Sequence, residues 1–567
     1  MTRCIGHPFV VVASQTGEDT SSDEAMQKIM SWIQECSSPS HKHCPEIREK
    51  VLPTRVINVR KISGPDGSSF SVRLWKTAGA TGYYVCLSHC WGAPDSWPQC
   101  KTTQSNLESN LNGVPWDTLP KTFQDAIEVT YRLGYENIWI DSMCIVQDDP
   151  ADWGFESLKM ASIYENAVLT IAATNSKDSR GGLFHTSSPV MQTIEMPDDG
   201  RGIRLHLRAV RPHPRLWGSY TINEAFAPPS SSWPLLTRAW VYQERLLSPR
   251  VVHFTNMELI WECAHDFTCE CSTPHMPGQW KFTHSPPSKV CHGELISAGS
   301  YAHFWNPGTG NFKTRWREII EEYSPLSMTK QTDRLPAISG VAQQLAYASR
   351  GSLGNYMAGT WATTLAENLV WYSPMNLNRR QKSNISWSWA CAHGVVFFPQ
   401  LVVMDETHKH GFELRGYSFE PAASNPYGQL EKATITVLCS LLTTTLAQKK
   451  NEGDESEVEY QLGLPAHPEA ETSTEDKDKK TRFYADYNLS ESDLEPEERV
   501  YCMDMRVCGI DLSLRQWCVV LRQAKKQQQI GIKTFERIGI VSAPDELIDN
   551  NWFYGWTAED RRLIQIC

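Results

Sequence analysis

The sequence lacks features that would place the chain in several common classes of protein. No run of about 18 apolar residues occurs, so no membrane-spanning helix is expected. A short apolar patch from Pro8 to Ala13 soon gives way to acidic sequence and does not form a full signal-peptide core. No G-x-x-x-x-G-K-[ST] segment occurs, which excludes a P-loop nucleotide switch. These absences predict a soluble chain without a membrane span.

The chain also lacks an excess of basic residues, since 54 Lys and Arg stand against 65 Asp and Glu. Segment 451–500 alone contains 16 acidic and 5 basic residues, and this difference equals the net charge of −11 of the whole chain. We therefore predict a solvated, disordered acidic insertion at 451–500. The rest of the chain is formally neutral and offers no basic face for nucleic acid.

The 17 cysteines lack the regular spacing of a disulfide framework, which predicts reduced thiols and a cytoplasmic location. One dense group comprises Cys263, His265, Cys269 and Cys271, with His275 close by. These soft ligands could bind zinc, but C-x-H-x3-C-x-C is not a standard zinc-site spacing. Buried or surface thiols are the favoured interpretation, so no metal site and no cofactor are predicted.

Short apolar strands alternate with amphipathic helices in the first half of the chain. Strand candidates at 83–88, 137–141 and 168–174 are separated by helix candidates at 119–134 and 154–167. This β-α-β-α-β order predicts an α/β fold, in which a parallel sheet has helices on its faces.

The remaining segments predict a chain of four regions. An amphipathic helix at 23–36 and a β-hairpin at 55–77 precede the α/β segment, and short alternating runs follow residue 356. The first two predicted regions are a helix and hairpin region at 1–82 and an α/β domain at 83–263 with an insertion at 176–234. A helical connecting region at 264–355 and a β-rich C-terminal domain at 356–567, which contains the acidic insertion 451–500, follow.

Three blocks of the α/β segment resemble signature blocks of the fungal heterokaryon incompatibility (HET) family. YVCLSHCWG at 84–92 is similar to the family's Leu-Ser-Tyr-Cys-Trp-Gly block, except that His89 occupies the position where the family usually has Tyr. The second block extends from LPKTFQDAI to VLTIAAT, over 119–174. The third, TRAWVYQERLLSPRVVHF at 237–254, resembles a block that has Trp-Thr-Leu-Gln-Glu in the family.

The resemblance implies an effector of programmed cell death in fungal non-self recognition. The family's fold is similar to that of Toll/interleukin-1 receptor (TIR) domains, many of which cleave NAD at the nicotinamide bond. The resemblance therefore implies a TIR-like, flavodoxin-like sheet, self-association on activation and a protein recognition partner. It also makes NAD the candidate substrate of an NAD⁺ nucleosidase.

Glu244 is the candidate catalytic residue. TIR enzymes have their catalytic Glu four residues after a Trp, and Trp240 and Glu244 have this spacing here. A single carboxylate beside the ribose could stabilise the positive charge that develops as nicotinamide departs. The alternative is a structural ion pair of Glu244 with Arg238 or Arg245.

Five further residues are candidates for nucleotide binding, because parallel sheets form their pockets at the carboxyl ends of strands. They are Ser88, Trp91, Asp141, Arg238 and Trp240. Three of them have a structural alternative: Trp91 could pack in the core, Asp141 could cap the next turn, and Arg238 could pair with Asp141 or Glu244.

Two rival functions share most of these features. A non-enzymatic signalling adaptor would not need Glu244, and a small-molecule biosynthetic enzyme would need a pocket lined by 89–92 and 142–149. Ser88, His89 and Cys90 place nucleophiles beside a base, but adjacent strand residues point to opposite faces, which disfavours a serine or cysteine hydrolase.

Overall fold

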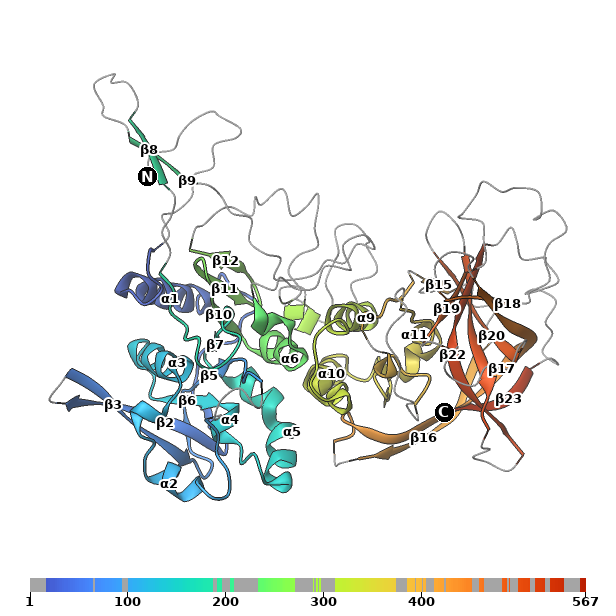
Figure 1. The fold of residues 1–567 in the computed structure, drawn as a ribbon, viewed down its shortest axis with the longest axis horizontal. Helices are drawn as coiled ribbons and strands as arrows, with labels where there is room; N and C mark the ends of the chain where they lie inside the picture. Colours follow the sequence, from blue (N-terminus) through green and yellow to red (C-terminus); the bar gives the residue numbers. More distant parts are fainter. Residues whose placement is uncertain are drawn as a thin grey trace. The chain divides into compact units, whose positions relative to one another are not determined.

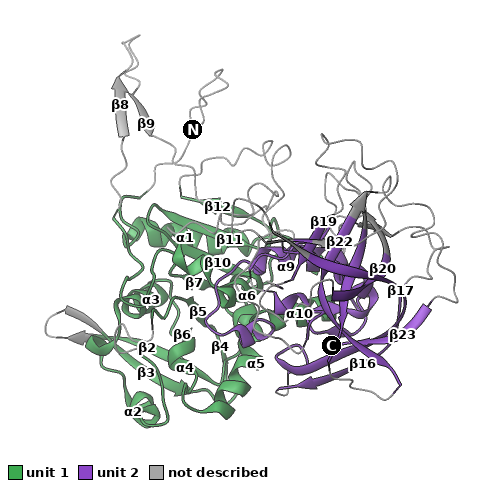
Figure 2. Ribbon diagram, turned by 45° about the vertical axis from the view of Figure 1, so that its right-hand side comes forward, with its two compact units in different colours: residues 1–311, 337–348 green, residues 312–336, 349–567 purple. Residues whose placement is uncertain are grey.

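The structure, a computed structural model, describes the following residues: 17–64, 67–93, 100–186, 191–195, 204–208, 233–270, 289, 292–293, 295–296, 312–373, 385–392, 394–399, 401–403, 412–422, 425–450, 458–462, 482–486, 489, 498–509, 515–525, 531–544 and 561–567. The chain divides into two compact units, shown in Figure 2. Unit 1 comprises Met1–Asn311 and Ala337–Ala348, and unit 2 comprises Phe312–Pro336 and Ser349–Cys567. No helix among the described residues is long and apolar enough to cross a membrane.

An eight-stranded mixed sheet lies at the centre of unit 1, with the strand order β12-β11-β10-β7-β5-β6-β2-β3 (Figure 1). Its four central strands, β10, β7, β5 and β6, pair in parallel. The strands are β2 (Arg55–Gly64), β3 (Gly67–Lys76), β5 (Val85–Ser88), β6 (Asn137–Ile140), β7 (Thr170–Ala172), β10 (Arg250–Phe254), β11 (Leu259–Cys263) and β12 (Phe267–Cys269).

The predicted parallel sheet is therefore correct for the centre and incomplete at the edges. The hairpin β2–β3 joins β6 in antiparallel register, and β11 and β12 extend the other edge in the same way. Across the sheet from β6 to β10, the four parallel strands are the second (β6), first (β5), third (β7) and fourth (β10) in chain order. Flavodoxin-like sheets begin with this order, and their ligands bind where the chain switches sides, between the first and third strands.

The helices of unit 1 begin and end where local sequence signals place them. The helix α1 (Asp23–Cys36) has the bounds that its amphipathic pattern predicts, and the side chain of Ser22 caps its start. The helix α3 (Lys121–Arg132) buries an apolar face and ends before Gly134, whose φ of +84° is a conformation that favours glycine. The helix α5 (Pro150–Asn166) begins four residues before the predicted start, because Asp149 caps it and Pro150 occupies its first position.

The remaining elements of unit 1 are short. Insertion 176–234 contains a two-stranded hairpin, β8–β9, and much of the insertion lies outside the described residues. These elements are β1 (Lys50–Val51), β4 (Thr81–Gly82), α2 (Leu107–Asn112), η1 (Trp116–Thr118), α4 (Asp141–Cys144), β8 (Met191–Glu195), β9 (Arg204–Arg208), η2 (Pro234–Thr237), α6 (Ala239–Leu247) and α10 (Ser339–Ala348).

The helix α10 belongs to unit 1, although the segments before and after it belong to unit 2. Its Gly340 amide donates a hydrogen bond to the side-chain oxygen of Gln243 on α6, at 2.7 Å. A Cβ at Gly340 would collide with Ala161 on α5 and with Gln243, so glycine is needed for this close approach. Unit 1 is thus completed by a helix that comes late in the sequence.

Unit 2 confirms the predicted β-rich C-terminal region. A nine-stranded sheet curls so that β17 pairs with both β23 and β20, which closes β20-β21-β22-β23-β17 into a ring. Each of these five strands is therefore paired with a neighbour on both sides, while β15 and β16 stand at the ends of the strand order. The strands of the nine-stranded sheet are β15 (Leu401–Val403), β16 (Phe412–Pro421), β17 (Leu430–Lys450), β18 (Val458–Leu462), β19 (Arg482–Ala485), β20 (Glu498–Gly509), β21 (Arg515–Gln523), β22 (Lys533–Pro544) and β23 (Arg561–Ile566).

The other elements of unit 2 precede this sheet in the chain. They are α9 (Phe312–Tyr323), η3 (Gln331–Asp333), η4 (Pro336–Ile338), β13 (Tyr356–Met357), β14 (Thr360–Trp361), η5 (Ala362–Thr364), α11 (Leu365–Asn368) and η6 (Trp389–Cys391), although the last part of η4 falls in unit 1. Within the acidic segment 451–500, the described residues form β18, β19 and the start of β20, and the other residues lie outside the described part of the chain.

Candidate functional site

The candidate site lies at the carboxyl ends of the parallel strands β5 and β6. Ser88 is the last residue of β5, and Asp141 follows the last residue of β6. Because β5 and β6 are adjacent and parallel, with Leu87 opposite Ile140, these two ends meet at one edge of the sheet. The helix α6 brings Glu244 to the same edge.

Ser88 and Glu244 form a direct contact in the interior. The Ser88 hydroxyl donates to Oε2 of Glu244 at 2.5 Å, although the residues are 156 positions apart in the sequence. Both side chains are buried. Tyr164 on α5 is a second hydrogen-bonding partner of the Glu244 carboxyl group, and its hydroxyl also lies 3.4 Å from the Leu87 carbonyl oxygen. The acid is therefore held by two hydroxyl groups.

A second group of side chains surrounds Asp141. The indole Nε1 of Trp91 donates to Oδ2 of Asp141 at 2.9 Å, and Nδ1 of His89 lies 3.7 Å from Oδ1. Oδ1 also accepts the amide hydrogen of Ser142 at 2.7 Å, while Ile140 occupies the N-cap position of α4, with no side-chain cap there. The Asp141 side chain is 20% exposed and reaches solvent.

Arg238 links the start of α6 to this edge. Its Nη1 donates to the His89 carbonyl oxygen at 2.8 Å, and its charge lowers the pKa of both Glu244 and Cys90 in opposition to their burial. The hydrogen bond of Arg238 thus holds the loop after β5, which was not among the predicted partners of this residue.

Burial and charge shift the protonation of the site. Burial, reinforced by the negative charge of Asp141, raises the pKa of Glu244 to about 7, although Ser88, Arg238 and Tyr164 oppose the shift. Burial also lowers the pKa of His89 to about 4, so this imidazole is neutral at physiological pH. Near pH 7, Glu244 therefore exists in both protonation states, which suits a group that takes up a proton or stabilises a positive charge.

Arg245, one of the predicted structural partners of Glu244, binds a different acid. Its Nε and Nη2 donate to Glu262 on β11 at 2.7 and 2.5 Å, and Nε2 of His253 lies 3.1 Å from the same carboxylate. Although burial opposes it, the charge of Arg245 holds the pKa of Glu262 well below its usual range. The structural ion pair that the sequence suggested for Glu244 and Arg245 is thus made by Glu262 instead.

Trp240 differs from the other candidates. It is half-buried and packs against the main apolar core of unit 1. The structure therefore brings Ser88 together with Glu244, and Trp91 together with Asp141, whereas it places Trp240 as a packing residue one turn before Glu244. Its predicted contact with nucleotide stays a prediction.

Sequence reasoning did not assign a role to Tyr164 or His89. Tyr164 lies on the buried face of α5, and a hydroxyl on such a face needs a polar partner, which is the signal that could have found it. His89 was noted as a substitution in its block and as the base of a disfavoured hydrolase, without a role beside Asp141. Within the described part of the chain, both of its ring nitrogens are buried without a hydrogen-bond partner.

The fold and this edge define an α/β domain with a buried acid at the carboxyl end of a parallel strand. Residues 84–244 match the model of the family described as Heterokaryon incompatibility protein (HET). The match extends from Tyr84, the residue before β5, to Glu244 and supports the predicted HET family for this part of the chain. No curated protein and no solved structure matches the chain.

Proposed function

We propose that the chain is an effector of heterokaryon incompatibility that hydrolyses NAD at the edge formed by Ser88, Asp141 and Glu244. The HET match over 84–244 supports the role in incompatibility. The chemistry rests on one observation: Glu244 is a buried acid, held by hydroxyl groups beside Asp141, with its pKa raised to about 7.

The location of the acid supports a nucleotide as the substrate. Ser88 ends the first parallel strand, and Ala172, at the end of the third, pairs with it. The proposed site therefore lies at the topological switch point, where the strand order reverses. Dinucleotides bind at this position in doubly wound sheets. Arg238 at the start of α6 is the nearby cation, and a guanidinium group matches phosphate oxygens.

The proposed reaction needs one carboxylate and no metal. Water adds to the ribose C1′ as the bond to nicotinamide breaks, which gives ADP-ribose, neutral nicotinamide and a proton. Ionised Glu244, with Asp141 nearby, stabilises the positive charge on the ribose in the transition state. The cationic nicotinamide ring of bound NAD favours this ionised form, since an adjacent positive charge lowers the pKa of an acid.

Glu244 is 5% exposed, so NAD can reach it only after this edge opens. We propose that self-association of the α/β domain produces the opening. This step makes turnover depend on protein concentration and keeps the dilute protein inactive.

The test is NAD turnover by the purified full chain at low and high protein concentration, beside Glu244→Gln. The matched control is Glu321→Gln in unit 2, since burial raises the pKa of Glu321 to about 8 but this acid lies in the other unit. We expect turnover that rises with concentration, is lost by about 100-fold or more in Glu244→Gln, and persists in Glu321→Gln. Folded protein without turnover at any concentration would instead support the non-enzymatic adaptor.

A further inference from the structure

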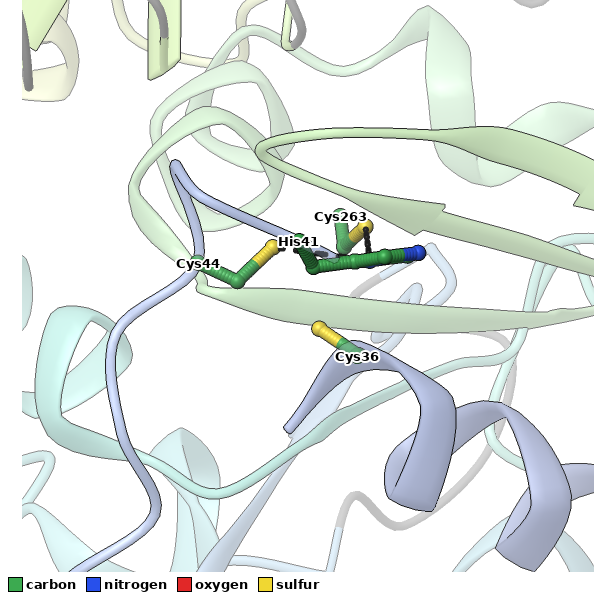
Figure 3. Close-up of side chains that lie close together, drawn as sticks. All are labelled: Cys36, His41, Cys44 and Cys263. Carbon is green, nitrogen blue, oxygen red and sulfur yellow. Dashed lines mark hydrogen bonds between the residues drawn. The ribbon is translucent and has the colours of Figure 1, made fainter. Parts of the chain in front are cut away.

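Four soft ligand side chains meet beside the edge of the sheet in unit 1, away from the acidic site. They are Cys36, His41, Cys44 and Cys263 (Figure 3). One ligand atom from each side chain lies within 4.8 Å of the other three. Cys36, His41 and Cys263 are buried, and Cys44 is half-buried. Three thiols and an imidazole therefore converge on one small volume.

Local turns bring the first three ligands together. The helix α1 ends at Cys36, and the chain then turns back on itself. The His41 amide donates to the Ser38 carbonyl oxygen at 3.1 Å, and the Cys44 amide donates to the His41 carbonyl oxygen at 3.1 Å. These consecutive turns place the side chains of His41 and Cys44 opposite the end of the helix, as Figure 3 shows.

The fourth ligand comes from the sheet. Cys263 is the last residue of β11, opposite Arg250 of β10. The helix α1 packs on β11 through Trp32 and Trp261, whose ring centroids are 5.9 Å apart. Arg250 donates to the carbonyl oxygen of Pro45 at 2.5 Å, which fixes the loop just after Cys44. Packing and hydrogen bonding thus hold both halves of the cluster in place.

The distances between the ligand atoms equal or slightly exceed those of a tetrahedral metal site. In a tetrahedral zinc site with bonds of about 2.0–2.3 Å, neighbouring ligand atoms lie about 3.5–3.8 Å apart. Nδ1 of His41 is 3.5 Å from the Cys263 sulfur and 4.0 Å from the Cys44 sulfur. We propose that Cys36, His41, Cys44 and Cys263 bind one zinc ion in a structural Cys3His site.

The surroundings of Cys263 support this assignment. The amide of Asp266 donates to its sulfur at 3.2 Å, and such a hydrogen bond stabilises a thiolate that binds a metal ion. All three cysteines are free thiols in the structure, so none is already used in a disulfide. With four protein ligands, the ion has no open position for a substrate, so its role is to join α1 and the following loop to the sheet.

This site differs from the cysteine group that the sequence suggested. Only Cys263 is common to both groups. Cys269 is buried in a separate apolar cluster, while Cys271 and His275 lie outside the described residues. The spacing around Cys263 gave no zinc motif because its partner His41 is 222 positions away in the sequence.

The first test is the metal content of the full chain, purified without a metal-affinity step from cells grown with added zinc. We expect one zinc per chain. After replacement of zinc by Co²⁺, we expect the intense visible absorption of a tetrahedral site with thiolate ligands. The matched variants are Cys44→Ser and Cys100→Ser, because both thiols are free and half-buried in unit 1. Cys44→Ser should lose the bound zinc, and Cys100→Ser should retain it.

Two results would overturn the proposal. One is wild-type protein with reduced thiols that contains no zinc and gives no Co²⁺ absorption from thiolate ligands. The other is a native disulfide between two of the three cysteines, detected by mass spectrometry. Both measurements use the wild-type chain, so they decide the question even if Cys44→Ser fails to fold.

Discussion

Two buried glutamates in unit 1 are held in opposite ways. Glu262 on β11 receives two hydrogen bonds from Arg245, and His253 lies beside it, so its charge is neutralised and its pKa is low. Glu244 on α6 is held by the hydroxyl groups of Ser88 and Tyr164, and its pKa is about 7. The first arrangement stabilises the fold around a fixed charge. The second keeps an acid between two protonation states.

Unit 2 contains another example of the first arrangement. Nη1 of Arg537 donates to both carboxylate oxygens of Asp486 at 2.8 Å, and both residues are buried. The Arg537 guanidinium also lies 3.6 Å from the centroid of the Trp371 ring. The chain thus places a buried carboxylate against a buried arginine where only stability is required. Glu244 has no such contact among the described residues, and this separates it from Glu262 and Asp486.

The largest expected effect would come from breaking the neutralised pair. Glu262→Gln removes the carboxylate that balances the buried Arg245, so we expect the free energy of unfolding to fall by about 3–5 kcal/mol. Urea unfolding of the full chain, with hydrogen exchange of the β10 and β11 amides to localise the change, measures this effect. If Glu262→Gln and Glu244→Gln lowered the free energy of unfolding by similar amounts, the distinction between the two acids would be contradicted.

The next effect is a pH dependence that only Glu244 should produce. Its pKa is about 7 in the folded chain against an ordinary value of 4.5, so between these values the folded chain retains a proton that the unfolded chain has released. Stability therefore falls as pH rises from 4.5 to 7, by up to about 3 kcal/mol. Glu244→Gln should remove this loss.

Unfolding of the wild type and Glu244→Gln at pH 5 and pH 8 measures this difference. His89 acts in the opposite direction, because its pKa is lowered to about 4 and it destabilises the fold as pH falls below 6.5. It is present in both proteins, so its contribution cancels in the comparison. Identical pH dependence in the two proteins would show that Glu244 is ionised in the folded chain like an ordinary glutamate.

The smallest effect concerns the Ser88 hydroxyl group, which donates a hydrogen bond to Glu244. Ser88 lowers the pKa of Glu244, so Ser88→Ala should raise it further, by about one unit for a bond worth about 1–1.5 kcal/mol. Infrared absorption of the protonated carboxyl group against pH follows this change. Ser142→Ala is the matched control, since Ser142 is a buried serine near the end of β6 whose hydroxyl has no partner among the described residues. An equal shift in both variants would exclude a specific role for Ser88.

Local patterns predicted the elements, and parallel pairing predicted that the ends of β5 and β6 meet at one edge of the sheet. The apolar spacing of α1 and the alternation of β5, α3, β6, α5 and β7 depend on neighbouring residues, so they could be recognised from the sequence. The meeting of Ser88 and Asp141 follows from two adjacent strand ends. The antiparallel edges of the sheet could not be predicted, because the hairpins carry no signal for which strand they join.

Contacts between distant segments were also beyond prediction. Arg245 and Arg238 are equally plausible partners of Glu244 in the sequence, and only the fold assigns Arg245 to Glu262 and Arg238 to the His89 carbonyl. The thiol and imidazole cluster combines residues near position 40 with one at the end of β11. Such a combination has no sequence spacing that could reveal it.

The position of α10 in the chain sets an order for the synthesis of the protein. Gly340 contacts Gln243, the neighbour of Glu244, yet it follows Gln243 by 97 positions. A ribosome therefore releases Glu244 well before the helix that completes the packing around α6. A chain terminated at residue 311 would contain the whole HET match but would lack this helix. Unit 1 is thus finished only when translation has passed well beyond its α/β sheet into the segment that begins unit 2.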